Sequence, residues 1–456
     1  MVGSEVRTPE QVTAAQARAD ELRAAAYPPS GSQPPLKQCD LVMKGGITSG
    51  VVYPLAGCEL AKTYRFRSIG GSSAGAIAAC LVAAAEYGRD TGGFNRLAQL
   101  PPEIGPTLPD LFSPGPKSKT AHTALMTWLD KDRSTGMRIV RILGAALWAR
   151  RWVLVWGFVL SVLAAVGIIT ARPIDETRTT ARSILAGTVF AAGVLFTIEQ
   201  ALMREVRSTI AGITEQGFGI CIGSAGPNAD PSGPPRYFTD WLGAKIDEIA
   251  GLGLPSAAGA EPRPPGPLLM RDLAAKEVVL QVMTTNLTQG RPMTFPFSDR
   301  TILFDPLELA AYFSPDVISA LGTDGPAANR GVELRSASGH PLYHLPAAED
   351  TPLIVAARLS LSFPALISAV PLYAVDYARA DEEDQVAVRC WFSDGGITSN
   401  FPVTSSTPCG RPARRSPSTC AATTRTTPTR TRTTAPGLER HGSRRSTASA
   451  GSSARS

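Results

Sequence analysis

Short apolar runs that end in glycine-rich turns recur in the N-terminal part of the chain. The first run, Asp40–Met43, leads into Lys44-Gly45-Gly46-Ile47-Thr48-Ser49-Gly50, and the second, Tyr64–Ile69, leads into Gly70-Gly71-Ser72-Ser73-Ala74-Gly75. A helical pattern follows each turn, over about 51–62 and 76–87. Strand, turn and helix occurring twice in this way predict parallel α/β architecture, in which the chemistry gathers at the carboxyl ends of the strands.

Two further strand patterns lie in the C-terminal half. The apolar segment Glu277–Met283 leads to a threonine-rich turn, and Arg389–Phe392 ends in Ser393-Asp394-Gly395-Gly396. Between them, a helical stretch that begins near Pro352 stops at Phe363-Pro364. These elements belong to one catalytic domain, which we expect to span residues 37–404.

A hydrophobic insertion interrupts this domain. Residues 152–170 are nineteen residues without a charge, and residues 183–198 are a second uncharged run of sixteen. A helix as long as the first run extends about 28 Å, close to the hydrocarbon thickness of a bilayer. Arginines before the first run and after the second favour the cytoplasmic side for both ends. The pattern predicts a transmembrane helical hairpin over 152–198; the alternative is a hairpin buried in a large core.

The two ends of the chain differ from the domain. Residues 1–36 predict an extension made of one helix and a Pro-rich linker, which we expect to be mobile or loosely docked. Residues 405–456 are a low-complexity Ser/Thr/Arg/Pro tail that cannot bury a core. One interpretation is a disordered basic tail that touches membrane or RNA. The abrupt change of character after Val403 favours the other, a frameshifted translation product, in which case a C-terminal part of the domain is missing.

Charge and cysteine content exclude several functional classes. The net charge is +6, but the tail alone contributes +9, so the other residues carry −3 and do not predict a nucleic-acid-binding surface. The seven cysteines are scattered without metal-type spacing, and there are only four histidines, so no metal site is expected. The scattered cysteines and the absence of a signal-peptide pattern fit a reduced, cytoplasmic setting.

Gly71-Ser72-Ser73-Ala74-Gly75 is a G-x-S-x-G sequence, with a strand pattern directly before it and a helical pattern directly after it. That context is typical of a nucleophile elbow, in which a tight turn exposes the central serine. The helix that follows presents its amino-terminal amides to an oxyanion. Ser73 is therefore the candidate nucleophile. The alternative is a structural helix start with Ser72 or Ser73 as the N-cap.

A serine nucleophile needs a general base, and the histidines are poorly placed for that role. His122 precedes the hairpin, His340 and His344 lie in a Pro/Gly-rich loop, and His441 is in the tail. A carboxylate is the better candidate. Asp394 follows a strand and precedes two glycines, which would let the backbone turn and leave the carboxylate in the cleft. The alternative for Asp394 is an Asx-type turn residue.

The glycines after the first strand complete the candidate site. Gly45 and Gly46 offer unhindered backbone N–H groups that could stabilise an oxyanion. A phosphate-cradling loop is the competing interpretation, but the spacing is not G-x-G-x-x-G and no P-loop Lys-Ser/Thr pair follows the glycines.

Three motifs follow one another in this order: Lys44–Gly50, Gly71–Gly75 and Asp394-Gly395-Gly396. The sequence Asn400-Phe401-Pro402 comes after them. Together they resemble the patatin-like phospholipase family over about residues 38–404. The resemblance implies a three-layer α/β/α fold with a central, mostly parallel sheet. It also implies a Ser-Asp dyad, with Ser73 as nucleophile, Asp394 as general base, and the amides of Gly45, Gly46 and Ala74 as oxyanion donors. Gly71, Gly75, Gly395 and Gly396 support these motifs. The sequence departs from the family at Ser49, where a basic residue is usual, and in the hydrophobic hairpin.

The expected function is therefore acyl-ester hydrolysis of a lipid at a membrane, with the catalytic domain on the cytoplasmic side. No metal or organic cofactor and no nucleic-acid partner is expected, and the oligomeric state is left open. Two alternatives remain. One is an acyltransferase that uses the same dyad with an alcohol or lysolipid as acceptor, and the other is a catalytically inactive membrane-anchored scaffold.

Overall fold

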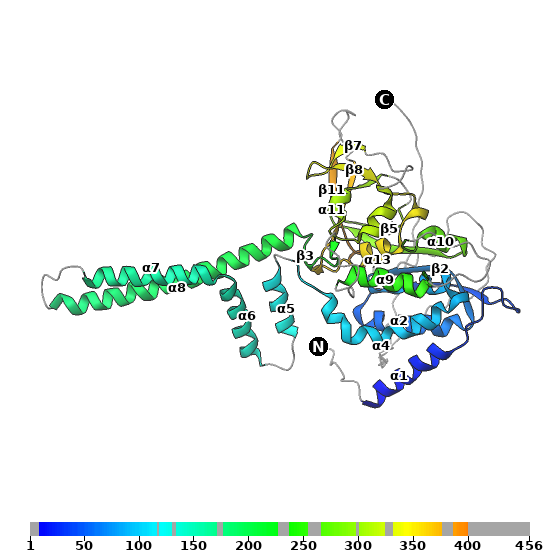
Figure 1. Cartoon of the computed structure of the whole chain (residues 1–456), viewed down its shortest axis with the longest axis horizontal. Helices are drawn as coiled ribbons and strands as arrows, with labels where there is room; N and C mark the ends of the chain where they lie inside the picture. The colour runs from blue at the N-terminus through cyan, green and yellow to red at the C-terminus, as the bar shows by residue number, and fades with distance from the viewer. Residues whose placement is uncertain are drawn as a thin grey trace, which may run out of the picture. The chain divides into compact units, whose positions relative to one another are not determined.

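The computed structural model describes residues 9–115, 118–129, 134–170, 177–226, 237–253, 266–297, 301–323, 332–375 and 386–399. The expected tail, residues 405–456, lies outside the described residues, as does the Asn400-Phe401-Pro402 motif. Figure 1 shows the order of helices and strands along the chain.

Nine described strands form the main sheet, in the order β1-β2-β4-β11-β10-β6-β8-β7, with β5 also paired to β4. Their bounds are Lys37–Met43 (β1), Tyr64–Ser72 (β2), Val279–Asn286 (β4), Arg291–Phe295 (β5), Ile302–Phe304 (β6), Val332–Arg335 (β7), Pro341–His344 (β8), Val370–Val375 (β10) and Ala387–Asp394 (β11). The expected parallel order holds for β1, β2 and β4, and the other described pairs of this sheet are antiparallel. The main sheet is therefore mixed, with both parallel and antiparallel strand pairs.

The register of β4 places two strands end to end. Met283 pairs with Ser72 of β2, whereas Thr284 pairs with Asp394 of β11. Strand β5 pairs with both Met283 and Thr284, so it occupies one edge of β4 and leaves the opposite edge to β2 and β11 together. The carboxyl ends of β2 and β11 therefore meet along that edge.

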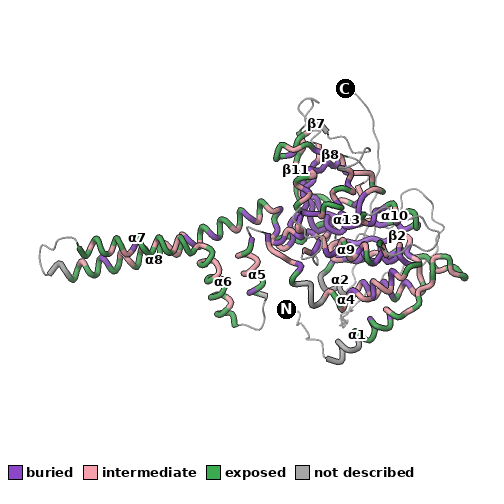
Figure 2. Tube along the Cα trace, viewed as in Figure 1, coloured by how far each residue is buried: buried purple, intermediate pink, exposed green. Residues whose placement is uncertain are grey.

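An alanine-rich helix, α3 (Ala74–Tyr87), packs on β1, β2 and β4. Its side chains are buried nearly all round, which is typical of a helix enclosed by other elements. The helices that pack against it are α2 (Ile47–Ala61), α4 (Gly93–Thr107), α9 (Phe238–Ala250) and α13 (Leu353–Leu361). The mixed α/β class expected from the sequence is thus confirmed, with the core between this helix group and the sheet (Figure 2).

Several described helical segments of the domain are short. They are α10 (Met270–Ala275), α11 (Pro306–Leu309), α12 (Pro315–Ile318), a π-turn at Ser319–Thr323, and 3₁₀ turns at Arg89–Thr91, Leu108–Leu111, Ala348–Asp350 and Gly395–Ile397.

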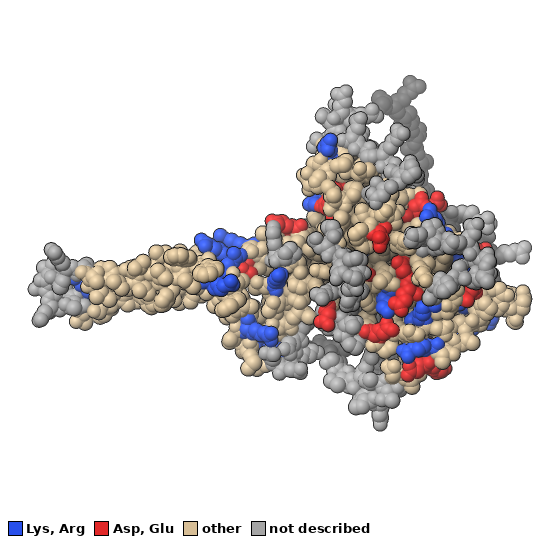
Figure 3. Space-filling model, in the orientation of Figure 1, with Lys and Arg blue, Asp and Glu red and all other residues tan. Residues whose placement is uncertain are grey.

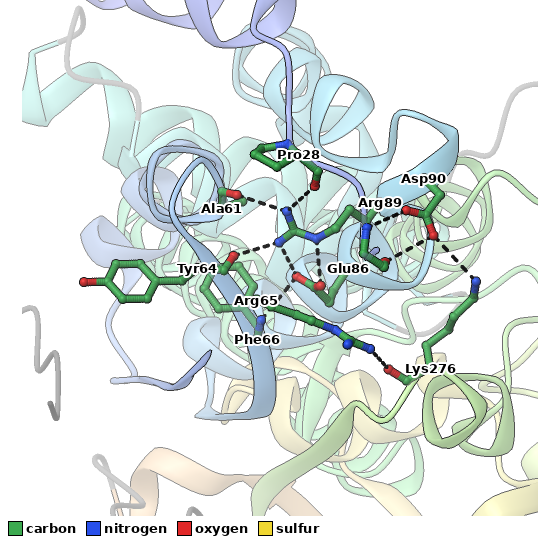
Figure 4. Close-up of polar contacts among 10 residues, drawn as sticks. Pro28, Ala61, Tyr64, Arg65, Phe66, Glu86, Arg89, Asp90 and Lys276 are labelled. Atoms are coloured by element: carbon green, nitrogen blue, oxygen red, sulfur yellow. Dashed lines mark hydrogen bonds and ion pairs between the residues drawn. The ribbon is translucent and has the colours of Figure 1, made fainter. Parts of the chain in front are cut away.

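The expected helix of the N-terminal extension is present, and it packs against the domain that follows. Helix α1 (Pro9–Ala24) packs on α4 and buries Ala19 and Leu22. The Asn95 side-chain amide donates to the carbonyls of Arg23 and Ala25, at 2.8 and 2.9 Å. The buried Arg89 guanidinium donates to the carbonyl of Pro28 in the linker (Figure 4). These anchors come from α4 and from the turn after α3.

The hydrophobic insertion forms two long helices, α7 (Arg151–Thr170) and α8 (Thr177–Glu215), which pack side by side (Figure 1). They follow α5 (Lys119–Leu129) and α6 (Thr135–Ala149). Both α7 and α8 are long and apolar enough to cross a membrane. Most of their residues are exposed or half-buried in Figure 2, and Ser161 is the buried residue of α7, so this pair is not a hairpin buried in a core.

Helix α8 runs well past the expected end of the insertion at residue 198, and it leads directly to a second, two-stranded sheet. There β3 (Gly219–Cys221) pairs in parallel with β9 (Ala365–Ile367). Strand β9 follows α13 by a few residues. The apolar insertion is therefore tied to the segment that connects α13 with the sheet.

Candidate active site

Ser73 lies at a sharp turn between β2 and α3. Its backbone angles are φ 58° and ψ −130°, a sparsely populated conformation for a residue with a side chain. The flanking glycines permit the turn because neighbouring backbone atoms lie too close to them for a side chain. A Cβ at Gly71 would lie 2.2 Å from the carbonyl oxygen of Gly75, and a Cβ at Gly75 would lie 2.3 Å from that of Met43. The local geometry is that of a nucleophile elbow.

The structure brings Ser73 and Asp394 together, although they are 321 residues apart in the chain. The Ser73 hydroxyl donates a hydrogen bond of 2.6 Å to Asp394 Oδ2, a length typical of a hydroxyl bonded to an ionised carboxylate. The contact follows from the end-to-end arrangement of β2 and β11 on one edge of β4. Asp394 is 3% exposed, so this hydrogen bond is largely shielded from bulk water.

Three backbone contacts fix Asp394. Its second carboxylate oxygen accepts from the amide of Gly396 at 2.6 Å, its own amide donates to the Ser362 carbonyl at 3.1 Å, and its carbonyl accepts from Thr285 Oγ1 at 2.8 Å. Burial raises the pKa of Asp394, and hydrogen bonds from Ser73 and Gly396 offset part of that rise because they stabilise the charged form. Asp394 is thus a fixed carboxylate with increased proton affinity.

The two motif glycines after Asp394 have separate roles. Gly395 is buried, and a Cβ there would lie 2.1 Å from the Met283 carbonyl oxygen and 2.9 Å from Ser72 Oγ. Gly396 supplies the amide that holds Asp394. The Asx-type contact considered from the sequence is therefore present, and it coexists with the Ser73 contact on the other carboxylate oxygen.

The glycine loop after β1 lies beside the elbow. The carbonyls of Met43 and Lys44 face the Cα of Gly75, within 3 Å of where a Cβ would be. Gly45 is buried, and Gly46 is exposed and precedes α2 with a φ of 146°. Ala74 is the first residue of α3, so its amide belongs to the helix turn that lacks intrahelical acceptors. All three candidate oxyanion donors therefore lie in segments that adjoin Ser73.

Sequence reasoning missed Ser360, at the end of α13. Its hydroxyl accepts from the backbone amide of Ser73 at 3.0 Å and donates to the Met283 carbonyl at 2.6 Å. It thereby ties the elbow to β4. No local pattern marks this serine, because its role depends on how α13 packs against two distant segments.

Arg358, also in α13, was missed as well. It is 1% exposed, donates to the carbonyls of Ile222 and Ser368, and also bonds the Ser362 hydroxyl. The carbonyl of Ser362 is the group that accepts from the Asp394 amide. Burial lowers the pKa of Arg358 to about 10, so the guanidinium remains charged at neutral pH. Arg358 thus supports the segment that positions Asp394.

The described residues do not assemble a histidine base for Ser73 or a metal site. The His340 ring contacts Asp305 Oδ2 at 2.9 Å rather than the dyad, and His441 lies outside the described residues. Within the described ranges, no group of three or more His, Cys, Asp or Glu side chains could hold a metal ion.

Comparisons with known proteins add one relative. No family model matches the chain. The chain is similar to a protein named "RpoH suppressor" from Rhizobium meliloti (strain 1021), with 31% identity over 431 residues. The match covers 81% of this chain and 64% of that protein, so the chain spans less than two thirds of its relative's length.

Proposed function

We propose that the protein is a serine acyl-ester hydrolase of the patatin-like phospholipase type, with Ser73 and Asp394 as its catalytic dyad. The observation that carries this proposal is the 2.6 Å hydrogen bond between a serine in a strained strand–helix turn and a buried carboxylate. A structural N-cap serine would bond its own helix, whereas the Ser73 side chain makes no cap hydrogen bond within α3.

In the proposed mechanism, Asp394 accepts the Ser73 proton as Oγ attacks the ester carbonyl. The raised proton affinity of the buried carboxylate favours this transfer. The amides of Gly45, Gly46 and Ala74 stabilise the oxyanion of the tetrahedral intermediate. The proton passes to the departing alcohol, and Asp394 then activates a water molecule that releases the fatty acid from Ser73.

Exposed apolar residues in the segments that adjoin the dyad's strands and turns support a lipid substrate. Leu287 directly follows β4, Phe363 follows the Ser362 that holds Asp394, and Ile397 lies three residues after Asp394; all three are exposed. The apolar helices α7 and α8 supply the proposed membrane hairpin, whose arginine-rich ends favour a cytoplasmic catalytic domain.

Activity-based labelling tests the proposal. The full chain, reconstituted in vesicles, should react with a fluorophosphonate and hydrolyse a short-chain acyl ester. Ser73→Ala should abolish both reactions, and Asp394→Asn should lower them by about a thousandfold because an amide cannot accept the proton. Ser338→Ala, in an exposed turn, is the matched control and should behave as wild type. Full activity in Ser73→Ala would overturn the assignment. Product analysis with and without an alcohol acceptor separates hydrolysis from acyl transfer.

A further inference from the structure

The contact between α7 and α8 is made by small residues in a fixed register. A Cβ at Gly157 would lie 2.1 Å from Thr197 Cγ2, and a Cβ at Gly193 would lie 2.5 Å from Ser161 Oγ. The two hydroxyls are already satisfied, since Ser161 donates to the Gly157 carbonyl and Thr197 to the Gly193 carbonyl, both at 2.7 Å. Close contact at small residues is typical of helix pairs in membranes.

Beside this contact lies a groove of about 630 Å³. Its walls are mainly large apolar side chains, and Trp152, Trp156, Leu160 and Phe196 are each more than 60% exposed. The hydroxyls of Ser161 and Thr197, which also line the groove, are hydrogen-bonded within their own helices. This part of the groove therefore favours an apolar occupant, because it has few free hydrogen-bonding groups for water.

One end of the groove is polar. Gln200 and Arg204 of α8 line it there, beyond the last apolar residue of the second uncharged run. Arg150 Nε bonds Glu205 at 2.8 Å, which places Arg204 level with the start of α7. Arg204 is exposed and forms no ion pair with a described carboxylate. Figure 3 shows basic side chains gathered at this end of the helix pair, with uncharged residues along most of the rest.

We propose that this groove binds one anionic phospholipid of the surrounding bilayer, with an acyl chain between α7 and α8 and the phosphate on Arg204. The inference rests on the membrane hairpin of the proposed function, but not on the Ser73 chemistry. Trp152 and Trp156 lie at the same end as Arg204, as expected for tryptophans at a headgroup boundary. In hydrocarbon, an apolar groove fills with a chain, and a guanidinium at its mouth selects a negative headgroup.

Native mass spectrometry of the full chain tests this site. The Ser73→Ala variant is used as the background, so that a bound lipid is not cleaved. It is incorporated into nanodiscs of equal parts phosphatidylglycerol and phosphatidylcholine, released in mild detergent, and analysed for retained lipid. We expect one retained lipid per chain, with phosphatidylglycerol preferred by about tenfold.

Two matched pairs of variants locate the lipid. Arg204→Gln should remove the headgroup preference, whereas Arg207→Gln, one turn further along α8 and outside the groove lining, should keep it. Ala164→Trp fills the groove and should abolish retention of both lipids, whereas Leu163→Trp, exposed and outside the lining, should retain them.

Three outcomes would overturn the site: equal retention in the two tryptophan variants, equal headgroup preference in the two glutamine variants, or a lipid-free dimer in which a second copy occupies the groove. A chain that fails to enter nanodiscs would refute both the hairpin and the site. If the protein proved not to be an esterase, the expected lipid retention would be unchanged, because the background variant already lacks the Ser73 hydroxyl.

Discussion

The hydroxyl of Ser360 lies 3.0 Å from the backbone nitrogen of Ser73 and accepts its hydrogen bond. Ser360 also donates to the Met283 carbonyl, in the strand that pairs with both β2 and β11. A side chain from α13 thus fixes the backbone of the elbow relative to the strand that aligns both members of the dyad. We regard Ser360 as a positioning residue for the proposed reaction.

Ser360→Ala should lower kcat by about fivefold with little change in KM, because the loss of one hydrogen bond of about 1 kcal/mol loosens the elbow without touching the substrate. Steady-state kinetics on a short-chain ester measure this split. Ser360→Thr keeps the hydroxyl and should recover part of the rate. Equal loss in both variants would indicate a packing effect instead of the hydrogen bond.

The pH dependence should reflect the burial of Asp394. Burial raises the pKa of this carboxyl above its ordinary value near 3.8, and only the ionised form can accept the Ser73 proton. The rate of fluorophosphonate labelling should therefore fall on acidification with a midpoint above 3.8. His340→Gln is the control, because His340 contacts Asp305, and it should leave the midpoint in place. A midpoint at or below 3.8 would contradict the prediction.

The raised pKa of Asp394 also affects folding stability, and its effect on stability runs opposite to its effect on the rate as pH rises. Because the native state favours protonated Asp394, its contribution to stability is present at low pH and is lost as pH rises through the raised pKa. The free energy of unfolding of Asp394→Asn should therefore lack this decline. Denaturant unfolding of both proteins across the acidic range measures the difference, and parallel pH curves would exclude it.

The glycine at position 75 should be nearly irreplaceable. Gly75→Ala would place a methyl group 2.3 Å from the Met43 carbonyl oxygen, in a backbone contact that cannot yield without moving the glycine loop from α3. We expect a loss of about 1–3 kcal/mol in the free energy of unfolding. Gly144→Ala in α6 is the matched control, since a Cβ there meets nothing within 4 Å. It should be neutral or stabilising by up to about 1 kcal/mol, because alanine favours a helix.

The elements around the dyad could be predicted from sequence because their signals are local. A strand pattern, a G-x-S-x-G turn and an alanine-rich helix are adjacent in the chain, and Asp394 with its two glycines directly follows a strand. The meeting of Ser73 and Asp394 depends on β4, which pairs Met283 with one strand and Thr284 with the other. Such register is set by long-range packing, and no local pattern encodes it.

The supporting residues were hidden for the same reason. Ser360 and Arg358 lie in an apolar helix, where a serine and an arginine carry no distinguishing spacing, and their partners are carbonyls and amides of distant segments. The residues that anchor α1 and its linker were not identified either, because they are side chains of Arg89 and Asn95 that bond backbone carbonyls. Because every residue has a backbone carbonyl, a hydrogen bond to one cannot be recognised from the sequence.

The buried Arg89 should account for a large share of the stability near the N-terminal extension. Its fully buried guanidinium pairs with Glu86 at 2.7 Å and donates to the carbonyls of Pro28, Ala61 and Tyr64 (Figure 4). Arg89→Ala would leave the Glu86 carboxylate buried without its cation, at a cost of about 3–5 kcal/mol in the free energy of unfolding. It would also free the linker that holds α1, so trypsin should cleave within α1 faster than in wild type.

An exposed ion pair provides the comparison. Arg271 bonds Asp350 at 2.9 Å, with side chains 60% and 42% exposed, so Arg271→Ala should cost less than about 1 kcal/mol and leave cleavage of α1 unchanged. Denaturant unfolding and limited proteolysis of the two variants measure both effects. Equal destabilisation by the two substitutions would show that burial of Arg89 does not strengthen its role. Destabilisation by Arg89→Ala without faster cleavage would show that other contacts hold α1.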